Sequence, residues 1–234
     1  MRELSKEEVK IFKNKGVLII DDYISLDLCR SIIADIKKFE DNEKMIFVNN
    51  KKRIGRFKTL NGKTLIKASQ TCLMLRDKTL ELIKKYLDDK IVNILNMKIG
   101  VSANIMSVGD NFKKHYDRNK ITAVIYLNQC NGEGEMLCYP RCRFLLPGRY
   151  LFGLRHLQIF LDRIVLNSFY QKYFVRKFII APKPGRVVFF EGNRTLHGVQ
   201  PLHKKSSVRY SIQLAYDLCE DMFGENKTTN YYGN

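Results

Sequence analysis

The sequence predicts an α+β protein whose core is mainly β, with helices packed on a β-sandwich or barrel. Apolar residues recur at three- and four-residue spacing before residue 98, and from Lys98 onward the spacing changes to two. The chain has 234 residues, of which 45% are hydrophobic, which suffices for one domain with a packed core. We therefore expect one domain over residues 1–234, with a helical N-terminal support region at 1–97, the β core at 98–217 and a C-terminal tail at 218–234.

The first helix has the clearest boundaries. Ser5 is followed three residues later by Glu8, which is the capping-box pattern, and Gly16 is placed to end the helix. The other elements before residue 98 follow from apolar spacing and turn residues. They are a buried strand at Val17–Ile20, a helix from about Ser25 to Phe39, loops and short strands over 44–67, and a helix capped by Asp77.

The β core should contain six strands, because apolar residues alternate there in short runs. The expected strands are 99–108, 120–128, 135–139, 186–190, 195–199 and 208–216. An insertion of about residues 141–183 interrupts them. Apolar residues three or four apart between Leu151 and Phe169 predict an amphipathic helix in it. A connection of this length inside a compact sheet is usually functional or forms a small structure of its own.

The positive charge is concentrated in two segments. The formal net charge is +17; residues 44–76 contain nine basic and no acidic residues, and residues 141–183 contain nine basic residues against Asp162 alone. Such a field attracts polyanions or acidic peptides, so nucleic acid is a candidate partner. A basic surface without a specific anionic partner explains the charge equally well.

Neither the cysteines nor the N-terminus indicate secretion. The six cysteines form no CxxC pair and no zinc-like spacing, and residues 1–15 are charged without a signal-peptide core. No run of 18 apolar residues is present. We therefore expect reduced thiols, a cytoplasmic location and no membrane span.

Two histidines and an aspartate form the candidate metal site. His115 and Asp117 are two residues apart, so on an extended segment both side chains point to the same side. His197 lies on a later predicted strand that could face them. Two imidazoles and one carboxylate occupy one face of an octahedral ferrous ion and leave the other positions open. A zinc hydrolase could use the same residue types, and His203 is the main competing ligand.

An arginine after the last histidine favours iron with an organic-acid co-substrate. Arg209 and Ser211 share one face of the predicted strand 208–216. A guanidinium group pairs with a carboxylate through two charge-assisted hydrogen bonds, and a nearby hydroxyl adds to that pairing. Tyr126, on the predicted strand 120–128, could donate a third hydrogen bond.

With these residues in place, the chain resembles the 2-oxoglutarate- and iron(II)-dependent dioxygenases, most closely their prolyl-hydroxylase-like branch. The resemblance covers about residues 99–139 and 182–217. Met106 stands where prolyl hydroxylases often have tyrosine, and the insertion is longer than their corresponding connection. The segments that carry the resemblance are GDNFKKHYD at 109–117, ITAVIYLN at 121–128, GEGEML at 132–137, PGRVVFF at 184–190, HGVQP at 197–201 and VRYS at 208–211.

The resemblance implies a double-stranded β-helix, which is a jelly-roll barrel with helices on one side. It also implies Fe(II), with 2-oxoglutarate and O2 as co-substrates, release of succinate and CO2, and ascorbate as a further candidate cofactor. Because Asp117 supplies a carboxylate that related halogenases lack, hydroxylation is expected. Carried onto this sequence, the iron ligands are His115, Asp117 and His197, and the residues for 2-oxoglutarate are Arg209, Tyr126 and Ser211.

The expected substrate is a protein or peptide, with proline as the favoured residue, because the nearest motif match is to prolyl hydroxylases. Oxidation of a nucleic acid is the alternative, motivated by the net charge and by aromatic and basic residues interleaved over 169–177. Small-molecule hydroxylation is also open, and the intact ligand set argues against an inactive binding module. The oligomeric state is open too, and insertion residues such as Phe160 and Phe169 could serve a dimer contact.

Overall fold

The computed structural model describes residues 2–39, 45–50, 55–94, 96–130, 132–146, 152–204 and 207–218. The expectations for the tail after Leu218 and for Leu151 lie outside these residues. So does part of the basic segment 44–76. The described strands are β1 (Val17–Ile20), β2 (Ile46–Asn50), β3 (Gly55–Asn61), β4 (Val92–Asn93), β5 (Val101–Met106), β6 (Asn111–His115), β7 (Ile121–Tyr126), β8 (Met136–Tyr139), β9 (Phe178–Ile180), β10 (Val187–Glu191), β11 (Leu196–Val199) and β12 (Arg209–Asp217).

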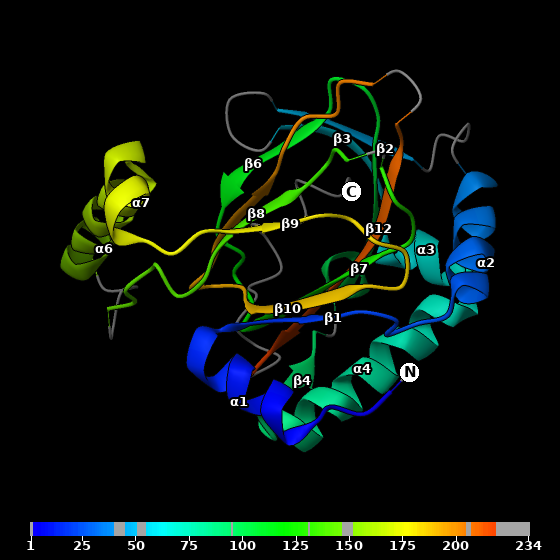
Figure 1. Ribbon diagram of the computed structural model, residues 1–234, viewed down its shortest axis with the longest axis horizontal. Helices are drawn as coiled ribbons and strands as arrows, with labels where there is room; N and C mark the ends of the chain where they lie inside the picture. The colour runs from blue at the N-terminus through cyan, green and yellow to red at the C-terminus, as the bar shows by residue number, and fades with distance from the viewer. Residues whose placement is uncertain are drawn as a thin grey trace.

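These strands form one antiparallel sheet in the order β1-β10-β7-β12-β5-β3-β6-β11-β8-β9, with β2 paired to β3 and β4 paired to β12. The sheet curls into a half-barrel with helices around it (Figure 1). Four strands, β10-β7-β12-β5, make one side, and β6-β11-β8-β9 make the other. The chain passes repeatedly from one side to the other, which is the strand order of a double-stranded β-helix. The predicted fold class is confirmed.

The helices are α1 (Lys6–Lys15), α2 (Leu26–Lys37), α3 (Gly62–Ala68), α4 (Gln70–Tyr86), α5 (Met97–Gly100), α6 (Phe152–Leu166) and α7 (Ser168–Phe174). The capping box of Ser5 and Glu8 is present, and Gly16 ends α1 with a φ of 69°. Helices α2 and α4 pack on the outside of the sheet, where Ile32 and Ile83 are fully buried in the same core as sheet residues such as Phe189. Burial of this apolar face holds the helices against the barrel.

The prediction that Asp77 caps a helix is wrong. Helix α4 begins at Gln70, and Asp77 lies inside it, where its carboxylate accepts a hydrogen bond from Asn93 at 3.1 Å. Cys72 and Leu75, in the first two turns, are buried together with Ile83 farther along the helix. The continuous buried face therefore extends the helix toward its N-terminus past the residue that looked like a cap.

The N-terminal region contributes strands to the barrel as well as helices. Strand β1 pairs with β10, and β3 pairs with both β5 and β6, so β3 connects the two sides of the half-barrel. All six predicted strands of the core are present within two residues of their expected ends. The strand expected at 99–108 is two residues shorter at each end and begins after α5. The division of the chain at residues 97 and 98 stays a prediction.

The insertion forms a pair of helices, α6 and α7, at the left of Figure 1, followed by the unpredicted edge strand β9. The expected amphipathic helix is present as α6. It stops before Phe169, because Asn167 accepts a hydrogen bond from the backbone of Phe169 and begins α7. Within the part of the chain that the structure describes, no helix is long and apolar enough to cross a membrane.

Candidate metal centre

The two histidines of the site are direct partners across two antiparallel strands. His115 is the last residue of β6, and its Cα partner in the register is His197 of β11. Asp117 follows β6 by two residues, and its backbone N–H donates to the carbonyl of Gly192 in the turn between β10 and β11. Sheet register thus brings together residues that are 82 positions apart in the chain.

The three side chains converge on one point. Oδ1 of Asp117 lies 3.4 Å from Nε2 of His115 and 3.6 Å from Nε2 of His197. One ligand atom from each residue lies within 4.8 Å of the others, and among the described residues this is the single such group. His203, the competing candidate, is exposed, and its backbone N–H binds the carboxylate of Glu133. The geometry therefore favours the triad predicted from the sequence.

Hydrogen bonds orient each of the three groups. Nδ1 of His115 lies 2.8 Å from the carbonyl of Lys113, and Nδ1 of His197 lies 3.1 Å from the carbonyl of Thr195. Donation from Nδ1 to a carbonyl leaves the Nε2 lone pair for a metal. Thr122 donates to Oδ2 of Asp117 at 2.6 Å, so Oδ1 remains for the same metal.

The protonation states also suit a cation. Burial disfavours the charge on Asp117, but attraction to His197 and the hydrogen bonds from His115 and Thr122 lower the pKa of this carboxyl to about 2. Burial lowers the pKa of His197 to about 4. At neutral pH the site therefore holds a carboxylate and a neutral imidazole, which are the forms that bind divalent metals.

A buried cation lies beside the triad. Arg209, only 3% exposed, donates from one terminal nitrogen to Oγ of Ser211 at 3.2 Å and lies with its guanidinium carbon 4.9 Å from the centre of the Tyr126 ring. The same nitrogen lies 3.5 Å from the sulfur of Met106, its register partner on β5. Burial raises the pKa of the Tyr126 phenol, so its hydroxyl stays a donor.

Two donors of this group have no partner within the protein. Nε of Arg209 and the hydroxyl of Tyr126 are both buried and make no hydrogen bond. A buried polar group without a partner costs folding free energy. Two such donors, one of them part of a guanidinium cation, are complementary to a carboxylate. His115, His197, Arg209 and Ser211 line one common cavity. The residues present thus fit a metal ion and an organic acid side by side.

Two contributors to the site were not predicted from the sequence. Thr122 orients Asp117 from β7, and Gly192 lies so close that a Cβ atom there would meet Cβ of Asp117 at 2.9 Å. Threonine in a strand and glycine in a turn are common, and their spacing from Asp117 matches no known site motif. Their role is visible only in the structure, where the turn between β10 and β11 lies against β7.

The insertion is attached next to the metal ligands. The ring of Tyr116, between His115 and Asp117, lies 4.6 Å from the guanidinium carbon of Arg143, which forms a double hydrogen bond with Asp162 of α6. Lys114, on the other side of His115, hydrogen-bonds Gln171 of α7. Both residues that flank His115 therefore contact the insertion.

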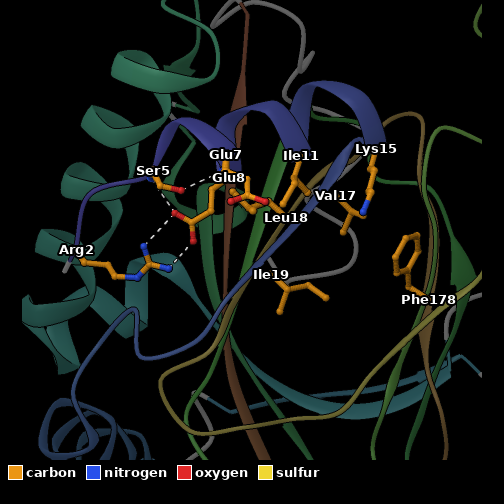
Figure 2. A pocket seen from close by; sticks show the side chains of 10 residues that line it. All are labelled: Arg2, Ser5, Glu7, Glu8, Ile11, Lys15, Val17, Leu18, Ile19 and Phe178. Carbon is orange, nitrogen blue, oxygen red and sulfur yellow. Dashed lines mark hydrogen bonds and ion pairs between the residues drawn. The ribbon is translucent and has the colours of Figure 1, made fainter.

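A second depression, of about 480 Å³, lies between α1 and the edge strand β1 (Figure 2). It is larger than the cavity of the metal centre. Its polar groups are largely occupied by each other, since Glu8 accepts hydrogen bonds from both Arg2 and the backbone of Ser5. None of its lining residues also lines the cavity of the metal centre. This depression is separate from the metal centre.

The matching family model is described as the 2OG-Fe(II) oxygenase superfamily and covers residues 101–216. A crystal structure of the non-heme alpha ketoglutarate dependent epimerase SnoN from nogalamycin biosynthesis superposes with a TM-score of 0.66 at 14% identity, over 91% of this chain and 82% of that one. A Pseudomonas putida prolyl-4-hydroxylase gives 0.58 at 15% identity, over 90% and 97%. A Trichoplax adhaerens prolyl hydroxylase in complex with a hypoxia inducible factor peptide gives 0.58 at 16%, over 90% and 87%. No curated protein matches the chain.

Proposed function

We propose that this chain, which belongs to the 2OG-Fe(II) oxygenase superfamily, hydroxylates a protein or peptide, with proline as the favoured residue. As a member of that family it is a 2-oxoglutarate-dependent dioxygenase that uses Fe(II). The observation that carries the reaction class is the single cavity that the histidine pair shares with Arg209 and Ser211. In this proposal His115, Asp117 and His197 hold the iron. Arg209, Tyr126 and Ser211 hold the distal carboxylate of 2-oxoglutarate.

The protein's own residues orient and protect the reactants. Iron held there would let O2 oxidise both 2-oxoglutarate, to succinate and CO2, and the substrate, with one oxygen atom going to each. Thr122 and the two backbone carbonyls keep the ligand atoms directed at one point. The buried guanidinium of Arg209 and the Tyr126 phenol donate to the carboxylate and set the direction from which the co-substrate approaches the metal. The apolar side chains of Val124 and Met136 in the cavity wall limit water there.

The fold comparison and the charge of the protein support a peptide substrate. Prolyl hydroxylases share the fold over nine-tenths of this chain, and one of them is described with a peptide bound. The formal net charge of +17 suits an acidic or extended peptide.

The test is to screen a peptide library with the Fe(II)-loaded protein. We expect succinate formation that depends on a peptide, and a gain of one oxygen atom on a proline of that peptide. His115→Ala should abolish decarboxylation of 2-oxoglutarate, whereas His203→Ala should leave it unchanged. No oxidised peptide, together with oxidation of a single-stranded oligonucleotide, would replace this proposal by the nucleic-acid alternative.

Small-molecule oxidation is the second candidate, because the epimerase SnoN superposes with a higher TM-score than the two prolyl hydroxylases. The two candidates differ in how strongly the substrate depends on the basic charge of the protein. Turnover of an acidic peptide should be inhibited by increasing salt, since the formal net charge of +17 contributes to binding it. Turnover of a small metabolite that is insensitive to salt, without peptide oxidation, would favour the second candidate.

A further inference from the structure

The outer face of the insertion is unusually apolar for a surface exposed to water. Large side chains of α6 and α7 are between 45% and 68% exposed, and the two helices stand at one end of the half-barrel (Figure 1). Large apolar side chains exposed on two adjoining helices are typical of an interaction site. Its most exposed members, hereafter the α6–α7 face, are Leu157, Phe160, Leu166, Phe169, Tyr173 and Phe174.

A helix that covers a barrel usually buries its apolar side chains and exposes its polar ones, whereas α6 and α7 bury glutamines and expose large apolar side chains. Their most buried side chains include Gln158 and Gln171, each 5% exposed. Gln158 binds the backbone of Phe144 and Leu146, and Gln171 binds the carbonyl of Val165 and the ammonium group of Lys114. Polar contacts thus attach the inner side of the pair together with the buried Val165, and most of the large apolar side chains are exposed.

The charge around this face is positive. The segment 141–183 has nine basic residues and one acidic residue, a net charge of +8 (9 − 1). The carboxylate of the acidic residue, Asp162, is already engaged by Arg143. Arg163, Lys172 and Lys177 are exposed on or next to the two helices. An apolar face with exposed cations beside it is complementary to a surface that is apolar inside and anionic outside.

We propose that the α6–α7 face binds the surface of an anionic lipid bilayer. Aromatic and basic residues alone would also suit a nucleic acid, but Leu157 and Leu166 are aliphatic and have no function in stacking on bases. Helix α6 has 15 residues, which is too short to span a bilayer and suits a helix lying in its interface. The ion pair of Arg143 and Asp162 and the contact of Lys114 with Gln171 would then place the metal centre close to the membrane surface. This inference is independent of the proposed function, because it requires neither iron nor substrate.

The experiment is sedimentation of the protein with vesicles of phosphatidylcholine, with or without phosphatidylserine. We expect binding to the vesicles that contain phosphatidylserine and a decrease in binding with added salt. The double variant Phe160→Ser, Phe169→Ser should bind about tenfold more weakly, since two large apolar side chains no longer enter the bilayer. Lys172→Gln should bind about fivefold more weakly.

Phe47→Ser is the matched control. Phe47 is 50% exposed on β2, within the other basic segment, and this variant should bind vesicles as the wild type does. Circular dichroism and a thermal midpoint show that each variant is folded. Equal binding to neutral vesicles, no binding at all, or binding that survives the double variant would overturn the proposal. So would a stable dimer that buries Phe160 and Phe169 without vesicle binding.

Discussion

Thr122 and Asp117 form a hydrogen bond of 2.6 Å in which the threonine hydroxyl donates to Oδ2 of the carboxylate. The other oxygen, Oδ1, is thereby directed to the two histidines. Thr122 itself is fully buried, so this bond has no competition from solvent. Thr122 can therefore orient Asp117 for the iron that we propose it holds, without contacting the metal itself.

Thr122→Val should weaken metal binding by about 10- to 100-fold, because the carboxylate loses the bond that orients it. Titration with Co(II), followed by its visible absorption, measures the affinity. Thr122→Ser retains the hydroxyl and should restore most of it. An unchanged Co(II) affinity in Thr122→Val would contradict this account.

Arg209→Ala should raise the KM for 2-oxoglutarate by roughly 10- to 150-fold, because the carboxylate loses its charge-assisted hydrogen bonds. The rate of 2-oxoglutarate decarboxylation as a function of its concentration gives this value. Arg30→Ala is the control, since Arg30 is exposed on α2 and pairs only with Asp27 in the same turn. Metal affinity should be unaffected in both variants.

Tyr126→Phe removes only the hydroxyl that lacks a partner within the protein. We expect affinity for 2-oxoglutarate to fall by about tenfold, which corresponds to one net hydrogen bond. Stability without 2-oxoglutarate should stay the same or rise, because a buried unsatisfied donor is removed. Calorimetric titration and thermal unfolding measure the two quantities. A variant that loses stability without 2-oxoglutarate would show that the hydroxyl is structural.

Gly192→Ala should disturb the candidate metal site although it replaces none of the three candidate ligands. The new methyl group would meet the carbonyl of Asn119 at 2.8 Å and Cβ of Asp117 at 2.9 Å. Such overpacking costs about 1–3 kcal/mol and displaces the carboxylate, so Co(II) affinity should fall with stability. Gly132→Ala is the control, because Gly132 has a φ of 78° but nothing within 4 Å of the added atom. That variant should lose stability and keep its affinity.

The carboxyl group of Asp21 should stabilise the fold only while it is ionised. Hydrogen bonds from Arg186 lower the pKa of the Asp21 carboxyl below 3.8, the value expected in an unfolded chain. Its contribution is therefore present above that value and is lost as the pH falls toward the folded-state pKa. Asp21→Asn should flatten the decrease in unfolding free energy as the pH falls below about 4, measured with urea.

Local spacing predicted much of this protein because it fixes which side chains share a face. His115 and Asp117, and likewise Arg209 and Ser211, are two residues apart on extended backbone, so their relation does not depend on the rest of the fold. Strong alternation marked the buried strands for the same reason. Strand β6 was missed because its sequence, NFKKH, is polar and half exposed, and cross-strand pairing rather than apolar burial holds it.

By itself, the sequence determined the fold class, the six main strands and the residue types of the metal site, since these depend on periodicity and short spacings. Only the tertiary structure decided that His197 pairs with His115, because register is a property of sheet closure and not of either strand alone. It also decided that Thr122 supports Asp117 and that most of the large apolar residues of α6 and α7 are exposed to solvent. An amphipathic pattern identifies two faces of a helix, and the packing partners determine which of them is buried.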